Sequence, residues 1–225
     1  MPRPTGARTV LYPVFLDLRG ATVLVVGGGS VAARKIAALL DAGANVTVVS
    51  PRIDPLLSRL TRRRGLRLLR REYRSTDIKK QSLVFALTDN LALNRRIANH
   101  ARRARIPVNV AAPPEAGDMQ IPAQVRRGAL CVAVSTGGAS AALAANWRQR
   151  LERIIGPEWD VWLAELDILR RQILREVESD SVRRALLQEL GALRWGRLVR
   201  DKGVARARAE AKKLIRRRTM PKVKR

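Results

Sequence analysis

Three consecutive glycines follow a short run of β-branched residues near the start of the chain. The run is Thr22–Val26, and the next six residues, 27–32, fit the pattern G-x-G-x-x-A. In this pattern the first glycine permits a tight turn, and the second lets the backbone approach a pyrophosphate. The N–H groups of the following helix then face the phosphates. We therefore predict a dinucleotide site formed by Gly27, Gly28, Gly29, Ser30, Val31 and Ala32.

The segment expected to contact the adenosine ribose lacks the acid that usually occupies it. A second strand is predicted at residues 45–50, and NAD sites usually carry Asp or Glu at the end of this strand. Here Ser50-Pro51-Arg52 stands at that place. Ser50 can hydrogen-bond a ribose hydroxyl, whereas Arg52 can favour a 2′-phosphate. The sequence leaves the choice between NAD and NADP open.

The elements that must position these residues alternate along the first half of the chain. Apolar runs predict strands at 22–26, 45–50, 66–73, 83–87 and 107–110. Helices are predicted between them at 31–40, 53–63 and 91–104. This alternation is typical of a Rossmann-like α/β fold with a parallel sheet.

The pattern changes after the Pro113-Pro114 pair. A strand is predicted at 130–135, and Ser140 is the expected N-cap of a helix over 141–155. Residues 158–198 are predicted to be mostly helical, with breaks near 179–181, Gly191 and Gly196. The fold class is thus a parallel α/β domain followed by a small mixed segment and a helical C-terminal region.

The composition excludes several classes of protein. Hydrophobic residues make up 46% of the chain, enough for a core, and the single cysteine, Cys131, excludes a disulfide framework and a Cys-rich zinc site. No apolar run approaches the roughly 20 residues that span a bilayer, so no membrane partner is expected. The first residues lack the apolar region of a signal peptide. We therefore expect a cytoplasmic protein.

The formal net charge of +26 is the most unusual property of the composition. The basic residues gather at 59–74, 95–105 and 200–225. Such clusters attract polyanions or form a solvated surface. The last cluster contains no aromatic residue, so the stacking signature of single-strand binding is absent. We do not expect specific nucleic-acid binding.

Several motifs in register make the chain resemble the N-terminal module of siroheme synthases. That family comprises precorrin-2 dehydrogenases, some of which are also sirohydrochlorin ferrochelatases. The similarity runs in unbroken order from residue 12 to about 165. It is carried by residues 12–20, 23–29, 31–35, 43–51, 86–90 with Leu93-Asn94, 106–110, 121–123 and 132–140.

The resemblance implies NAD-dependent oxidation of precorrin-2 to sirohydrochlorin by a homodimer. Arginine clusters suit this substrate, a tetrapyrrole with many carboxylate arms. The resemblance adds Pro51, Thr88 and Asp89 to the cofactor site, which already includes Ser50. It assigns substrate contacts to Asn109, Ser135, Thr136, Gly137 and Gly138, although residues 135–138 also suit an ordinary helix-capping loop.

The change of pattern after Pro113-Pro114, the basic C-terminal cluster and the resemblance together suggest how the chain is divided. We predict a Rossmann NAD-binding domain at 1–113 and a dimerisation segment at 114–150. A helical region at 151–200 and a basic tail at 201–225 follow. The helical region beyond about residue 165 carries no motif of the family.

The chain departs from the family at one position. In the family an Asn-Val-Val-Asp run supplies an aspartate central to catalysis, and the matching residue here is Ala112. Three hypotheses follow: a nearby carboxylate, Glu115 or Asp118, takes over; cofactor positioning alone supports dehydrogenation; or the protein is a degenerate dinucleotide- or tetrapyrrole-binding module. Ferrochelatase activity stays open.

The remaining distinctive side chains are expected to have structural roles. His100 is the only histidine and has no partner ligands in the sequence, so we predict a surface helix residue and no metal site. Cys131 is expected to be a buried small residue. The four tryptophans, Trp147, Trp159, Trp162 and Trp195, are expected to be core or dimer anchors.

Overall fold

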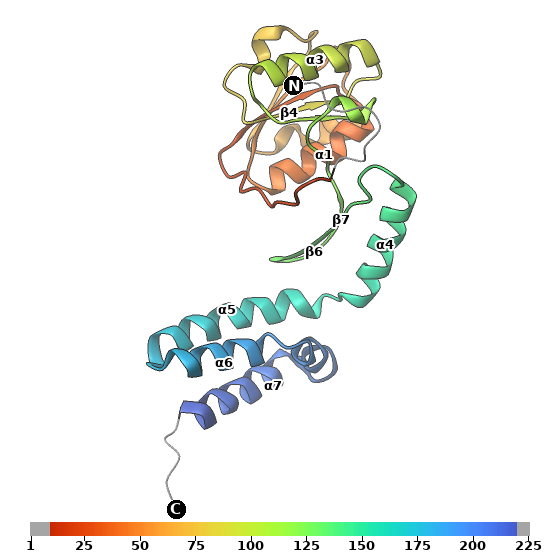
Figure 1. Ribbon diagram of the computed structural model, residues 1–225. Helices are drawn as coiled ribbons and strands as arrows, with labels where there is room; N and C mark the ends of the chain where they lie inside the picture. Colours follow the sequence, from red (N-terminus) through yellow and green to blue (C-terminus); the bar gives the residue numbers. More distant parts are fainter. Residues whose placement is uncertain (1–9, 220–225) are drawn as a thin grey trace, which may run out of the picture. The chain divides into compact units, whose positions relative to one another are not determined.

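The chain folds into two compact units in the computed structural model, which describes residues 10–219 (Figure 1). The first unit comprises residues 1–121 and the second residues 122–225. Each has its own hydrophobic core. The finer division into four parts stays a prediction.

A five-stranded parallel sheet forms the centre of the first unit. Its strands are β1 (Thr22–Val26), β2 (Asn45–Val49), β3 (Leu66–Leu69), β4 (Leu83–Ala86) and β5 (Val108–Val110). Their order is β3-β2-β1-β4-β5. The chain therefore moves outward from β1 to one edge and then returns to pair β4 with the other side of β1. The carboxyl ends of β1 and β4 meet at this change of direction.

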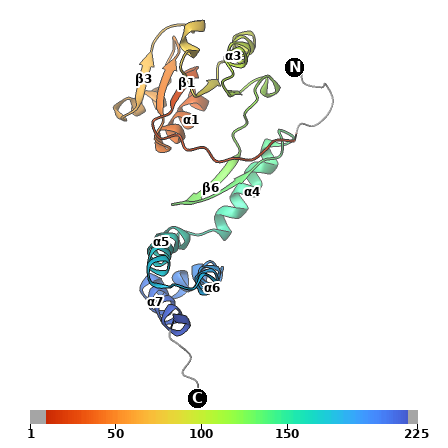
Figure 2. The ribbon, with the colours of Figure 1, turned by 60° about the vertical axis from the view of Figure 1, so that its left-hand side comes forward.

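Helices cover both faces of the sheet. Helix α1 (Ser30–Asp41) buries Ile36 against one face, and α3 (Leu91–Arg103) buries Ile97 against the other. Both helices are amphipathic, because their buried residues recur every three or four positions. Figure 2 shows α1 and α3 with strands β1 and β3. The predicted Rossmann-like fold is confirmed.

Two predicted elements are shorter than expected. The strand predicted at 66–73 ends at Leu69, because the Arg71 N–H turns back to the Leu69 carbonyl at 2.9 Å. The helix predicted at 53–63 is instead α2 (Pro55–Ser58) followed by a 3₁₀ turn at Arg59–Arg62. Glu72 and Tyr73 therefore lie beyond the end of β3, at the carboxyl edge of the sheet.

The second unit begins with a β-hairpin that was only half predicted. Strand β6 (Ala123–Arg127) pairs antiparallel with β7 (Leu130–Val134), and only β7 was expected from the sequence. Cys131 is half-buried rather than buried, since a two-stranded sheet cannot cover both of its faces. Helix α4 (Ala141–Ile154) follows, and the Ser140 hydroxyl accepts the Leu143 N–H at 3.1 Å. The predicted N-cap is confirmed.

Three further helices pack side by side in the second unit, as Figures 1 and 2 both show. They are α5 (Glu158–Glu176), α6 (Asp180–Leu190) and α7 (Arg194–Thr219). Trp162 and Trp195 stack at their centre, with ring centroids 4.9 Å apart. Both are core residues, as expected, whereas Trp147 is 47% exposed.

The last helix differs from its prediction. Gly196 does not interrupt α7; a β-carbon there would lie 2.5 Å from the Trp159 ring, so the glycine permits close packing. The kink occurs at Gly203, whose φ is 80°. Beyond it α7 continues to Thr219 through much of the predicted tail and buries Ala207, Ala211 and Ile215. Residues 220–225 lie outside the described part.

Within residues 10–219, no helix is long and apolar enough to cross a membrane.

The core of the helical region gives a direct test of the packing. Leu169 is fully buried in α5, whereas Leu174 of the same helix is 41% exposed. We expect Leu169→Ala to lower the free energy of unfolding by about 2–5 kcal/mol, because it removes buried methyl groups and leaves a cavity. Leu174→Ala should cost below about 1 kcal/mol. Denaturant unfolding followed by tryptophan fluorescence reports on the second unit, which holds all four tryptophans. Equal losses of unfolding free energy in the two variants would contradict the placement of Leu169 in the core.

Candidate functional site

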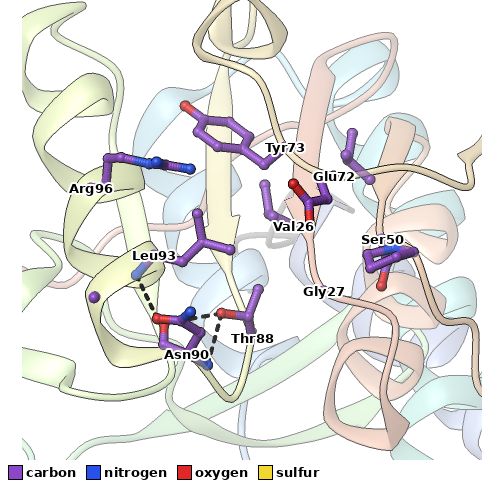
Figure 3. A pocket seen from close by; sticks show the side chains of 12 residues that line it. Val26, Gly27, Ser50, Glu72, Tyr73, Thr88, Asn90, Leu93 and Arg96 are labelled. Atoms are coloured by element: carbon purple, nitrogen blue, oxygen red, sulfur yellow. Dashed lines mark hydrogen bonds between the residues drawn. The ribbon is translucent and has the colours of Figure 1, made fainter.

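A pocket of about 390 Å³ opens at the carboxyl edge of the parallel sheet (Figure 3). It lies where β1, β2 and β4 end, beside the change of direction in strand order. Ligands of open α/β sheets bind in this crevice, because the strand exits leave room between loops that run to opposite faces. The lining residues are Val26, Gly27, Val49, Ser50, Pro51, Glu72, Tyr73, Thr88, Asn90, Ala92, Leu93 and Arg96.

The glycine turn leaves β1 in a conformation that depends on its lack of side chains. Gly27 has φ of 114°, and a β-carbon there would lie 2.5 Å from the Leu87 carbonyl oxygen. A β-carbon at Gly28 would lie 2.3 Å from the Arg52 carbonyl oxygen. At Gly29 a β-carbon would meet nothing within 4 Å. The first two glycines therefore serve close packing, and the third faces open space.

The amino end of α1 is ready to accept an anion. Gly29 is the N-cap and provides no side-chain cap, and the first turn carries no acidic residue. Gly29, Ser30 and Val31 are exposed there, whereas Ala32 is fully buried and lets α1 lie close to the sheet. Free N–H groups at a helix start, together with the positive end of its dipole, favour a phosphate. The open side of Gly29 gives a pyrophosphate room to approach.

The exit of β2 is fastened to the glycine turn. The Gly27 N–H donates to the Val49 carbonyl at 3.0 Å, and the Asp54 N–H donates to the Gly28 carbonyl at 2.8 Å. The Ser50 hydroxyl donates to the Arg52 carbonyl at 2.6 Å, and Ser50 is only 7% exposed. The predicted ribose contact thus lines the pocket, but its proton is already used within the loop.

Asn94 holds the exits of β4 and β5 together. Its buried side chain accepts the Thr88 hydroxyl at 2.7 Å and the Thr88 N–H at 3.2 Å. Its amide group donates to the Thr88 carbonyl at 2.9 Å and to the Ala112 carbonyl at 2.8 Å. Thr88 lines the pocket as predicted, and Asp89 is exposed in the same turn without lining it.

The acids proposed to replace the missing aspartate lie in the loop after β5. Glu115 is exposed in a 3₁₀ turn, Pro114–Ala116. Asp118 accepts the Val108 N–H at 2.7 Å, and so closes the loop onto β5. Neither acid lines the pocket at the ends of β1, β2 and β4. The structure therefore gives Asp118 a loop-closing role and leaves Glu115 in solvent.

Asn109 is buried on the α1 side of the sheet. Its side-chain oxygen accepts a hydrogen bond from the Lys35 ammonium group, and its amide group donates to the Met119 carbonyl at 2.9 Å. Burial, and then the charge of Arg34, lower the pKa of Lys35. The predicted substrate residue is thus tied to α1 and to the loop after β5.

The remaining predicted substrate residues lie in the second unit. The Ser135 hydroxyl accepts the Gly137 N–H at 3.1 Å, and the Thr136 hydroxyl donates to the Ser140 carbonyl at 3.0 Å. Gly137 and Gly138 have φ of 61° and 86°. The loop before α4 is therefore organised by its own side chains.

His100 supports the pocket wall from behind. Its Nδ1 atom lies 3.0 Å from the hydroxyl of Tyr73, a lining residue. Burial, followed by the charge of Asp77, raises the pKa of Tyr73 to about 12. Residues 10–219 contain no group of three or more His, Cys, Asp or Glu side chains that could hold a metal ion. His100 is thus a half-buried helix residue that contacts a pocket tyrosine.

Of the twelve residues that line the pocket, the sequence predicts four as cofactor contacts, namely Gly27, Ser50, Pro51 and Thr88. The strand predicted at 66–73 includes Glu72 and Tyr73, whereas β3 ends at Leu69. Asn90 and Leu93 belong to a family motif and Arg96 to a predicted helix, none with a predicted role in the site. A shorter third strand would have placed Glu72 and Tyr73 at the carboxyl edge of the sheet. No sequence signal distinguishes the pocket-facing residues of α3.

Comparison with known proteins gives matches over most of the chain. Residues 14–123 match a family model described as "Putative NAD(P)-binding". The siroheme synthase of Methylococcus capsulatus is 40% identical over 172 residues, which are 76% of this chain and 36% of that protein. The siroheme synthase of Neisseria meningitidis is 35% identical over 91% of this chain and 42% of its own length. The chain thus spans about two fifths or less of these curated relatives.

A solved structure matches along its whole length. The protein described as "SirC, precorrin-2 dehydrogenase" is 29% identical, with a TM-score of 0.75. The match covers 92% of this chain and 100% of that one. It therefore includes both the parallel sheet and most of the helical second unit.

The three glycines yield a paired test. We expect Gly28→Ala to lower the free energy of unfolding by about 1–3 kcal/mol, because its β-carbon would overlap the Arg52 carbonyl. Gly29→Ala should cost below about 1 kcal/mol but weaken NAD binding at least about tenfold, because the methyl group stands where a pyrophosphate approaches the helix start. Thermal unfolding without ligand and calorimetric titration with NAD measure the two effects. Unimpaired NAD binding by a folded Gly29→Ala variant would contradict this site.

Proposed function

The chain belongs to the family of siroheme synthase N-terminal modules, and we propose on that premise that it is an NAD-dependent precorrin-2 dehydrogenase. The reaction converts precorrin-2 to sirohydrochlorin with loss of one hydride and one proton. The observation that carries the proposal is the match to the whole length of SirC, a precorrin-2 dehydrogenase. A degenerate binding module is not favoured by that match.

The residues present fit a dinucleotide. Gly29 offers an open backbone position, α1 begins without a side-chain cap, and the adjoining pocket of about 390 Å³ has room for an adenosine. The backbone from Gly27 to Ser30 would hold the pyrophosphate, and Ser50, Pro51 and Thr88 would line the adenosine site. NAD, when bound, supplies the hydride acceptor.

The protein's own contribution is chiefly orientation. Ala112 offers only a methyl group and cannot accept the proton that leaves the tetrapyrrole, and Asp118 already binds the Val108 N–H. Acid–base assistance is typically worth about 10²–10⁴-fold, whereas orientation of reactants can contribute more. We therefore propose dehydrogenation without a side-chain base, the proton passing to water. Ferrochelatase activity is not part of this proposal.

A homodimer and a cytoplasmic location belong to the same proposal. An exposed apolar stripe on α4 supports self-association: Leu143, Trp147 and Ile154 are 49%, 47% and 60% exposed. Their spacing of four and seven residues places them on one face of the helix. The neighbouring two-stranded hairpin is itself a marginal structure without further packing. A second copy of the chain would cover such a surface.

Turnover is tested with the full chain. Precorrin-2 generated under anaerobic conditions is mixed with protein and NAD, and NADH formation is followed by absorbance. We expect NADH above a blank without protein. Intact NAD binding without NADH formation would overturn the enzyme and support the degenerate module.

Introducing a carboxylate at residue 112 tests whether the lack of a base at this position limits the rate of the reaction. We expect Ala112→Asp to raise kcat, by up to about 10²-fold, because it provides a base beside the β5 exit. Ala111→Asp is the matched control, since it adds the same charge one residue earlier. Equal effects of the two substitutions would contradict the alignment of Ala112 with the family aspartate.

The α4 stripe provides a test of assembly. Trp147→Glu should convert the dimer to a monomer, because it places a charge in the apolar contact. Leu193→Glu is the control: Leu193 is also exposed, at 74%, but lies between α6 and α7. Light scattering gives the masses. A monomeric unsubstituted chain would exclude the dimer.

A further inference from the structure

The pocket contains a carboxylate that enters from an unexpected strand. Dinucleotide sites usually read the adenosine ribose with an acid at the end of the second strand. Here β2 runs into Ser50-Pro51-Arg52, and the Ser50 hydroxyl donates its proton to the Arg52 carbonyl. The exit of β2 therefore offers no carboxylate to the ribose hydroxyls.

Glu72 supplies an acid from the next strand. It follows β3, which lies beside β2 in the sheet, and it lines the pocket together with Ser50 and Pro51. Glu72 is the single acid among the described residues that line this pocket. In Figure 3 its carboxylate lies between Tyr73 and Ser50, and Arg96 stands on the opposite side.

The turn that carries Glu72 is held firmly. Arg71 binds Asp77 with two hydrogen bonds of 2.6 and 2.9 Å, and it donates to the Glu72 carbonyl at 2.9 Å. The Arg74 N–H donates to the same Asp77 side chain at 2.8 Å. Asp77 and Arg71 therefore hold the backbone on both sides of Glu72.

The carboxylate of Glu72 is free to take a ligand. Asp77 is committed to Arg71, whereas no hydrogen bond or ion pair joins the Glu72 side chain to another residue between 10 and 219. A free carboxylate in a pocket accepts hydrogen bonds from a pair of adjacent hydroxyls. It also repels a phosphate placed at the same point.

We propose that Glu72 selects NAD over NADP by accepting hydrogen bonds from the 2′- and 3′-hydroxyls of the adenosine ribose and repelling a 2′-phosphate. This inference rests on the proposed function, because it assumes that the pocket holds the adenosine half of the cofactor. It assigns the ribose contact, which usually follows the second strand, to the strand beside it. Arg96, on the other wall, is available to lie against the adenine ring, as arginine does on aromatic faces.

The test is a comparison of dissociation constants for NAD and NADP, measured by calorimetry on the full chain without tetrapyrrole. We expect the unsubstituted chain to bind NAD at least about tenfold more tightly than NADP. Glu72→Gln keeps the shape of the side chain but removes its charge, and should bring the two constants within about threefold of one another. Glu115→Gln, an exposed acid of the same unit outside the pocket, is the matched control and should keep the preference.

The outcomes are separable from those of the enzyme assay. A preference for NADP in the unsubstituted chain, or an unchanged preference in Glu72→Gln, would overturn the inference while leaving dehydrogenation possible. A change produced by Ser50→Ala but not by Glu72→Gln would assign the ribose contact to β2 instead. Binding of NAD with the expected loss of preference supports Glu72 even if no turnover is seen. Failure to bind either dinucleotide would overturn both proposals.

Thermal unfolding of each variant confirms that the fold is intact. Within residues 10–219 the Glu72 carboxylate has no hydrogen bond or ion pair, so its substitution should leave the unfolding temperature within about 2 °C. Glu72→Ala repeats the test with a shorter side chain. It should lose the preference as Glu72→Gln does, because both remove the charge.

Discussion

The close packing of the glycine turn against two neighbouring strand exits is the constraint on which the site depends. Positions 27 and 28 approach the carbonyl oxygens of Leu87 and Arg52 so closely that no side chain fits at either one. Backbone hydrogen bonds to Val49 and from Asp54 fasten the same turn. The loops that follow β1, β2 and β4 are therefore joined to one another. Together they position the uncapped start of α1 and the residues that line the pocket.

Asn94 extends this constraint to the fifth strand. The buried Asn94 amide makes four hydrogen bonds within the protein. Its removal would be costly, because its partner groups on Thr88 and Ala112 would stay buried without a hydrogen-bond partner. The Asn94 side chain thus links the turn at Thr88 to the carbonyl of Ala112. The scaffold around residue 112 is thus maintained although the side chain there has no acid–base chemistry. That combination is consistent with a site that works by orientation.

The fold of the first unit could largely be predicted from the sequence. Apolar runs and amphipathic periodicity gave the alternating strands and helices, because both depend on neighbours within a few residues. The end of β3 could not be placed, since a backbone hydrogen bond from the Arg71 N–H back to the Leu69 carbonyl ends it. In the second unit, Gly196 and Gly203 are indistinguishable as sequence signals. Only the packing of Gly196 on Trp159 shows which glycine lies in a continuous helix.

The sequence by itself determined the glycine turn, the parallel sheet, the family and the absence of an acid at residues 50 and 112. These features are carried by adjacent residues and need no knowledge of distant contacts. Tertiary structure alone decided which other side chains share the pocket. Glu72 and Arg96 come from separate segments, after β3 and within α3, and they meet because parallel strands all end at one edge of the sheet. It likewise decided that Asp118 closes a loop, because its partner, the Val108 N–H, lies ten residues away across a turn.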